Sequence, residues 1–159
     1  MKKISFSGIW FCGVSGSGKT IASKIIKKNF KNSILLDGDK IRKLISFDLG
    51  YCLADRKVQI NRVFGIAQIC ISSGIFPIIT TVYMNQNMVK KLKQNKIIVV
   101  NILREFSQIK NRKKIYNNKI KDVVGVDIKF PKLKNVIYIK NNSKINVFLK
   151  EVERLINAG

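Results

Sequence analysis

The sequence Gly13-Val14-Ser15-Gly16-Ser17-Gly18-Lys19-Thr20 fits a pattern in which a glycine is followed by four residues of any kind and then by Gly-Lys-Ser/Thr. An apolar run at residues 8–12 precedes it and is typical of a buried strand. Residues 20–28 follow with apolar side chains at helical spacing. Strand, glycine-rich loop and helix form the context in which this pattern binds phosphate, so we predict a loop that holds a nucleoside triphosphate.

Each residue type in this loop has a physical reason to bind phosphate. Glycine adopts backbone conformations that a side chain would forbid, so successive N–H groups can converge on phosphate oxygens, and the next helix adds its positive dipole end. Lys19 is expected to reach the terminal phosphates of ATP, and the Thr20 hydroxyl to ligate Mg²⁺. The expected ATP-binding residues are Gly13, Val14, Ser15, Gly16, Ser17, Gly18, Lys19 and Thr20.

The apolar pattern along the chain indicates the fold class. With 159 residues, 46% of them hydrophobic, the sequence predicts one globular domain over residues 1–159. The sequence contains no run of about 18 apolar residues, so we expect no membrane-spanning helix. Strand-like runs alternate with helical patterns, which is typical of an α/β protein with helices on both faces of a parallel sheet. We therefore expect a P-loop kinase-type, doubly wound sheet of about five strands, at residues 8–12, 33–36, 76–82, 97–103 and 136–139.

Some of these elements carry more specific expectations. The runs at 33–36 and 97–103 are predicted to be buried strands. The longest helix is expected over residues 55–73, with Asp55 capping its start and Gly74 following its end. Further helices are predicted at residues 40–44, 86–94 and 145–156.

The charge and the cysteines limit the partners and the location. Lysine and arginine number 31 against 9 acidic residues, a formal charge of +22. Because the lysines are dispersed, the favoured explanation of this charge is that they lie on solvated faces, and the attraction of anionic substrates comes second. A nucleic-acid site is the least favoured explanation, because no basic patch is interleaved with aromatic residues. Cys12, Cys52 and Cys70 show no paired spacing and no histidine accompanies them, so we expect ordinary thiols in a cytoplasmic protein, without zinc.

Two acidic residues follow the second predicted strand. Asp37 and Asp39 lie where the carboxyl end of a parallel strand meets the ligand-binding edge of an open sheet. There they could position Mg²⁺ or accept a proton from an attacking hydroxyl, and no histidine is present to act as the base instead. The alternative is that Asp39 only caps the helix at residues 40–44.

Four segments together resemble the adenylylsulfate kinase family: GVSGSGKT, LDGDKIRKLI, FDLGYCLADR and IKDVVGVD. The resemblance is clearest over residues 8–82 and thinner over 113–130. It implies in-line transfer of the γ-phosphoryl group of ATP, with Mg²⁺, to the ribose 3′-hydroxyl of adenosine 5′-phosphosulfate (APS). Members of this family commonly form pairs, so it also implies a possible homodimer.

The match implies roles for individual residues. Lys19, Asp37 and Asp39 are the implied catalytic residues, with Asp39 close to the transferred phosphate. Two arginines match residues that hold the anionic groups of the acceptor, and Tyr51 matches an aromatic residue that stacks on its base. The segment containing Gly125 and Asp127 is implied to border the same site. The implied acceptor-binding residues are Asp39, Arg42, Tyr51, Arg56, Gln59, Lys121 and Val123.

The sequence departs from the family on the acceptor and lid side. Gln59 replaces an asparagine, residues 84–87 replace Ser-Pro-Tyr-Arg, Val123 replaces a phenylalanine, and the lid sequence at residues 107–112 is altered. A divergent branch with cytidine diphosphoramidate kinase activity, which serves surface polysaccharides, looks similar at these points. A smaller pyrimidine base could be held by Tyr51 with only Val123 opposite, so this kinase is the alternative function.

The altered lid also leaves a different class of function open. Residues 107–118 are predicted to be helical, either as a lid over ATP or as a solvated face. A nucleotide-binding module that no longer catalyses is the competing interpretation. The intact Lys19, Thr20, Asp37 and Asp39 favour the kinase.

Overall fold

A computed structural model of the chain describes residues 6–110, 116 and 120–157. Its centre is a five-stranded sheet in which all neighbouring strands are parallel, in the order β2-β3-β1-β4-β5. This confirms the predicted sheet of about five strands. The strands are β1 (Gly8–Cys12), β2 (Ser33–Asp37), β3 (Phe76–Thr81), β4 (Ile97–Leu103) and β5 (Ile137–Lys140).

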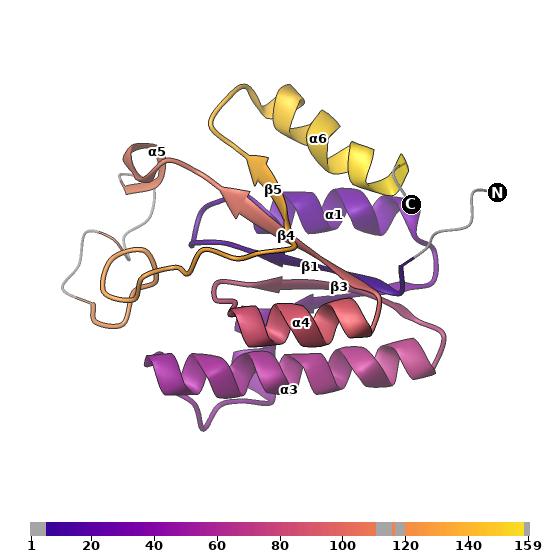
Figure 1. Ribbon diagram of the computed structural model, residues 1–159, viewed down its shortest axis with the longest axis horizontal. Coiled ribbons are helices and arrows are strands. Elements are labelled where there is room, and N and C mark those ends of the chain that lie inside the picture. Colours follow the sequence, from indigo (N-terminus) through magenta and orange to yellow (C-terminus); the bar gives the residue numbers. More distant parts are fainter. Residues whose placement is uncertain (1–5, 111–115, 117–119, 158–159) are drawn as a thin grey trace.

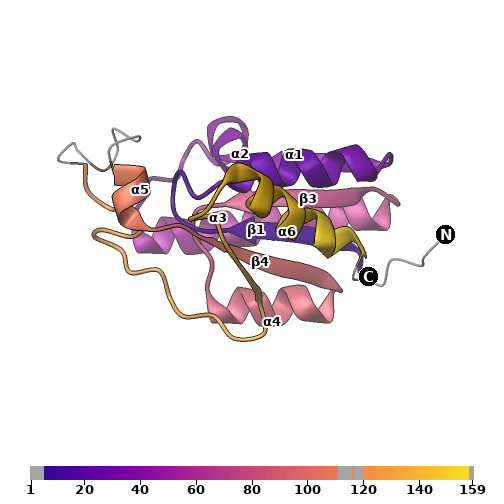
Figure 2. The ribbon, with the colours of Figure 1, turned by 90° about the horizontal axis from the view of Figure 1, so that it is seen from above.

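Helices cover both faces of the sheet. Figure 1 shows α1 and α6 on one face and α3 and α4 on the other, and Figure 2 shows the same layers from above. Alternate strand residues supply the two cores: Ile9 and Phe11 pack with α1 and α6, and Trp10 and Cys12 pack with α3 and α4. The helices are α1 (Lys19–Asn29), α2 (Gly38–Leu44), α3 (Leu53–Ser72), α4 (Gln86–Gln94), α5 (Phe106–Lys110) and α6 (Ile145–Asn157).

The second strand differs from its prediction as a buried strand. β2 forms one edge of the sheet, and Ile34 and Leu35 are each 39% exposed. An edge strand has a neighbour on one side only, which the apolar run alone does not reveal. The prediction is confirmed for most of β4, although Leu103 is 38% exposed at its end.

Two helix caps also differ from the expected ones. The Cys52 Sγ, not the Asp55 carboxylate, accepts from the backbone at the start of α3, where Asp55 N donates at 3.5 Å. Asp37, not Asp39, caps α2. Each cap is the residue directly before the helix, and both helices begin earlier than predicted. Gly74 follows α3 with a positive φ of 72°, as expected.

The remaining expectations concern thiols, the lid and membranes. Burial raises the pKa of the Cys12 thiol to about 12, which fits an unreactive core residue. Residues 107–110 of the helix predicted at residues 107–118 lie in α5, while residues 111–115 and 117–119 lie outside the described residues. Within the described ranges, no helix has the length and apolar character to cross a membrane. The described residues form one sheet with two cores, and the prediction of one domain over residues 1–159 stays a prediction.

Candidate functional site

The carboxyl ends of the strands carry two adjoining cavities. The loop cavity, of about 310 Å³, and the arginine cavity, of about 340 Å³, share part of their walls. The loop cavity is lined by Ser15, Gly16, Gly18, Lys19, Thr20, Ile21, Asp37, Asp39, Thr80, Thr81, Val82 and Arg104. The arginine cavity is lined by Ser15, Gly38, Asp39, Arg42, Lys43, Tyr51, Arg56, Gln59, Ile60, Thr81, Val82, Tyr83, Tyr116, Val123 and Val124.

The loop between β1 and α1 depends on its glycines. Gly13, Gly16 and Gly18 have φ values of 142°, 83° and 116°, which side chains rarely adopt. A Cβ atom at Gly13 would also lie 2.5 Å from the Ile102 carbonyl oxygen, and one at Gly18 would lie 2.6 Å from the Asn141 Nδ2. At Gly13 and Gly18 the loop therefore approaches the Ile102 backbone and the Asn141 side chain more closely than any other residue type allows.

The predicted ATP-binding residues are not all at the cavity surface. Ser15, Gly16, Gly18, Lys19 and Thr20 line the loop cavity. The Lys19 Nζ donates to the carbonyl oxygens of the first two loop residues, at 2.7 and 2.9 Å. The other three predicted residues, Gly13, Val14 and Ser17, do not line it.

Asp37 and Asp39 have different surroundings. The Asp37 Oδ1 accepts from Asp39 N at 2.9 Å and from Lys40 N at 3.2 Å, so this carboxylate fixes the start of α2. Asp39 is exposed and lines both cavities. Its carboxylate can therefore contact a ligand in either cavity, whereas Asp37 lines only the loop cavity.

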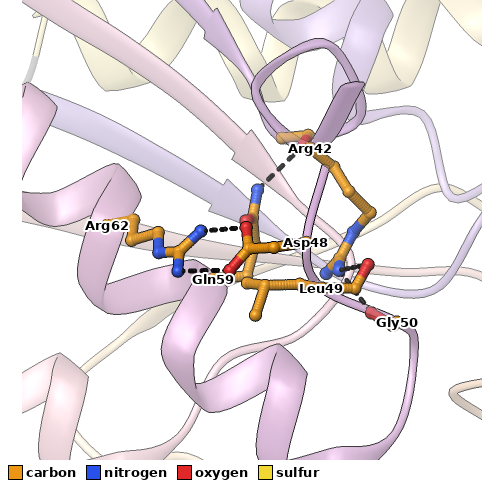
Figure 3. Close-up of polar contacts among 7 residues, drawn as sticks. Arg42, Asp48, Leu49, Gly50, Gln59 and Arg62 are labelled. Carbon is orange, nitrogen blue, oxygen red and sulfur yellow. Dashed lines mark hydrogen bonds and ion pairs between the residues drawn. The ribbon is translucent and has the colours of Figure 1, made fainter. Parts of the chain in front are cut away.

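Two buried arginines, each 8% exposed, flank Tyr51 in the arginine cavity. The Arg42 Nη1 donates to the carbonyl oxygens of Leu49 and Gly50 (Figure 3), and the Arg56 Nη2 donates to Asp122 O at 2.8 Å. Their Cζ atoms lie 4.8 and 5.6 Å from the centre of the Tyr51 ring.

The charges of these arginines are poorly compensated within the cavity. Burial, and then the charge of Arg42, lower the pKa of Arg56. The Arg56 Nε is buried and has no hydrogen-bond partner among the described residues. Lys43 adds a further positive charge to the lining, and among the lining residues Asp39 supplies the carboxylate. An anion in this cavity would satisfy both the charge and the unpaired donor.

Gln59 lines the arginine cavity, and one end of its side-chain amide has no partner among the described residues. Its Nε2 donates to Gly38 O at 3.1 Å (Figure 3), and because a carbonyl oxygen only accepts, this contact fixes the orientation of the amide. The Gln59 Oε1 is then buried without a partner in the described part of the chain. A ligand group that meets this oxygen must be a donor.

The later segment contributes one of the residues expected from it. Val123, 4% exposed, lines the arginine cavity, whereas Lys121 is exposed and lines neither cavity. The Asp127 Oδ2 accepts from Val123 N at 3.0 Å and holds the turn that presents this side chain. Gly125 has a φ of 95°, and a Cβ atom there would lie 3.0 Å from the Val14 side chain.

The oxygen atoms of the loop cavity fit a magnesium ion that arrives with a nucleotide. In the part of the chain that the structure describes, no group of three or more His, Cys, Asp or Glu side chains could hold a metal alone. Thr20 and Asp37 line the loop cavity and offer a hydroxyl and a carboxylate. Mg²⁺ prefers such oxygens and usually takes its remaining ligands from phosphates and water.

The sequence interpretation missed several residues of the two cavities. Arg104 lines the loop cavity directly after β4, and the rule that ligands bind at the carboxyl ends of strands would have indicated it. Thr81 ends β3 and accepts from the Trp10 Nε1 at 2.8 Å, and the same rule applies to it. The Tyr116 hydroxyl donates to Ser15 O at 2.7 Å, a contact 101 positions apart that no local pattern predicts.

Comparisons with known proteins show which proteins this chain is similar to. The family model described as adenylylsulphate kinase matches residues 6–137. The adenylyl-sulfate kinase of Buchnera aphidicola subsp. Acyrthosiphon pisum is 34% identical over 86% of this chain and 76% of that protein. The cytidine diphosphoramidate kinase of Campylobacter jejuni subsp. jejuni is 33% identical over 93% of each chain. The structure of the Mycobacterium tuberculosis APS kinase in complex with AMPPNP and APS has a TM-score of 0.81 and 21% identity, covers 98% of this chain and 99% of that one, and shares the fold.

Proposed function

The chain belongs to the adenylylsulphate kinase family, a family of ATP-dependent kinases, and we propose that it transfers the γ-phosphoryl group of ATP to the ribose 3′-hydroxyl of APS. The observation that carries this proposal is the shared wall of the two cavities. Asp39 lines both, together with Ser15, Thr81 and Val82. A phosphoryl donor in one cavity and a hydroxyl acceptor in the other would thus meet beside a carboxylate.

The loop cavity is the proposed ATP site. Its backbone N–H groups and the N-terminus of α1 would hold the phosphates, and the Lys19 Nζ would exchange its contacts with two loop carbonyls for phosphate oxygens. Thr20 and Asp37 would hold Mg²⁺, which neutralises phosphate charge when it is bound. Asp39 would accept a hydrogen bond from the attacking hydroxyl and hold it in line with the γ-phosphorus.

The arginine cavity is the proposed acceptor site. Arg42 and Arg56 supply donors for the anionic groups of the acceptor, and the Tyr51 ring supplies a surface for its base. Arg56 gains most from an anion, because its Nε is buried and unpaired within the described residues. An acceptor such as APS, which carries a phosphate and a sulfate, suits these donors.

A cytidine diphosphoramidate acceptor is the second candidate, and two observations favour it. Val123 lines the cavity that contains Tyr51, at the position where the family resemblance implies a phenylalanine, and this smaller side chain suits a smaller base. The unpaired Gln59 Oε1 requires a donor. APS has donors on its base and ribose but none on its sulfate, whereas the phosphoramidate group carries an additional N–H donor.

Turnover with the two acceptors tests both candidates in one assay. ADP release is coupled to NADH oxidation, with APS or CDP-phosphoramidate as the acceptor at fixed ATP and Mg²⁺. We expect turnover with APS that requires Asp39, and an Asp39→Asn variant that folds but loses most of it. Faster turnover with CDP-phosphoramidate would select the second candidate. No turnover with either acceptor would contradict the kinase proposal and favour a module that only binds nucleotide.

A further inference from the structure

Arg104 lines the loop cavity, and the proposed function gives it no role. It directly follows β4, is half-buried, and its Nη1 donates to the Gly16 carbonyl oxygen at 3.3 Å. Among the described residues that line the loop cavity, Lys19 and Arg104 carry positive charges, and Asp37 and Asp39 carry negative ones. The lining is therefore neutral overall, so each cation matters for a ligand as highly charged as a triphosphate.

A short network orients the Arg104 side chain. The Arg104 Nε donates to the Gln108 Oε1 at 3.4 Å, and the Gln108 Nε2 donates to Asn142 O at 3.1 Å. The Asn142 Oδ1 in turn accepts from Glu105 N at 2.8 Å. These contacts join the start of α5 to the segment between β5 and α6, so they restrict the guanidinium from the side opposite the glycine-rich loop.

The guanidinium retains donors for a ligand in this position. Arginine carries five N–H groups in a planar fork, and the contacts with Gly16 and Gln108 use two of them. A fork held on one side by Gln108 and on the other by the loop backbone loses little side-chain freedom when it binds phosphate oxygens.

We propose that Arg104 is a phosphate-binding residue for ATP, which acts with Lys19 as a second fixed cation of the loop cavity. This inference rests on the proposed function, because it takes ATP as the occupant of that cavity. The alternative is a structural role, in which Arg104 only supports the loop through Gly16 O.

Binding measurements with charge-matched variants separate these roles. Arg104→Lys keeps the charge, and Arg104→Gln keeps a donor for Gly16 O but removes the charge. Arg154→Gln on α6 is the matched control, because it removes an exposed arginine that pairs with Glu151 and lines neither cavity. Calorimetry gives the Kd of ATP, ADP and adenosine for each protein, and thermal unfolding confirms that each is folded.

We expect Arg104→Gln to weaken ATP binding by about 10- to 100-fold, because hydrogen bonds to charged groups are among the strong ones. Arg104→Lys should recover part of this loss, adenosine binding should be unchanged, and Arg154→Gln should bind ATP like the wild type. Full affinity in Arg104→Gln, or equal losses for ATP and adenosine, would overturn the proposal.

Two further controls make every outcome informative. If Arg104→Gln does not fold, the ¹⁵Nε resonance of Arg104 in the wild type, assigned by its loss in Arg104→Lys, is followed instead. It should shift with ATP but not with adenosine, and an unchanged resonance would contradict the proposal. A wild-type protein that binds no ATP would instead refute the proposed function, so the two failures are distinguishable.

Discussion

The loop cavity and the arginine cavity adjoin but are built in different ways. Half of the residues that line the loop cavity come from one stretch, residues 15–21, where the backbone conformation of the glycine-rich loop and the start of α1 places them. The arginine cavity collects residues from five separate parts of the chain, at residue 15 and at residues 38–60, 81–83, 116 and 123–124. A local site is constrained by backbone geometry, whereas a dispersed site can change its ligand one side chain at a time. Two of the sequence departures from the family, Gln59 and Val123, also line the dispersed arginine cavity.

Removing the loop cation should give the largest effect. Lys19→Ala should lower kcat by about 100-fold or more, because it removes a charge that stabilises the transferred phosphoryl group. The coupled ADP-release assay measures this change. The fold should persist, since α1 packs through buried residues such as Ala22 and Ile26 rather than through Lys19. Near-normal turnover in a folded Lys19→Ala protein would remove the loop cavity from the mechanism.

This local character explains why the donor side was predictable. Gly13, Gly16 and Gly18 were recognised from spacing alone, because the positive φ angles that they adopt restrict the residue types. Arg104 lies 84 positions or more beyond that loop, and the β1–β4 pairing brings it to Gly16, so the one signal for it in the sequence was its place directly after a predicted strand. Likewise, the apolar run of β2 revealed a strand but not its place at the edge of the sheet.

A change at Arg56 should separate the two cavities in kinetic terms. Arg56→Gln should raise the KM of the acceptor by about 10- to 100-fold, because a buried donor to an anionic group is lost. The KM of ATP should change little, since Arg56 does not line the loop cavity. Arg154→Gln is the control, because it removes an exposed arginine on α6 that lines neither cavity. Equal changes in both KM values would show that the cavities are not independent.

The acceptor side was only partly predictable, and the residues show why. Arg42, Arg56, Gln59 and Val123 were expected from the family resemblance, and all four line the arginine cavity. The resemblance also implied Lys121, which does not line it, because the turn that Asp127 holds presents Val123 instead. Their partners, such as Leu49 O and Gly38 O, are backbone atoms whose positions only the fold determines.

A smaller effect is expected from the residue that distinguishes the two candidate acceptors. Val123→Phe adds a ring to the cavity that contains Tyr51, and an aromatic contact is worth about 0.5–1.5 kcal/mol. The ratio of kcat/KM for APS to that for CDP-phosphoramidate should therefore rise by about 2- to 10-fold. The KM of ATP serves as the internal control. An unchanged ratio would mean that this position does not select the base.

The smallest effect should come from the ion pair that fastens the loop carrying Tyr51. Arg62 on α3 donates through Nη1 and Nη2 to the two carboxylate oxygens of Asp48, at 2.5 and 2.7 Å (Figure 3). These hydrogen bonds hold the pKa of Asp48 below its ordinary value. The pair is therefore fully charged above the usual carboxylate range and is lost only as the pH falls through that lowered pKa.

Because both partners are exposed, the pair orders the loop without contributing much energy. Asp48→Asn should raise the acceptor KM by about fivefold at most and leave the KM of ATP unchanged. Asp48→Asn combined with Arg62→Gln should do no more than either change alone, because both remove the same contact. If the two changes had additive effects on the acceptor KM, Asp48 and Arg62 would act on the arginine cavity separately. The dispersed site would then depend on even more independent positions.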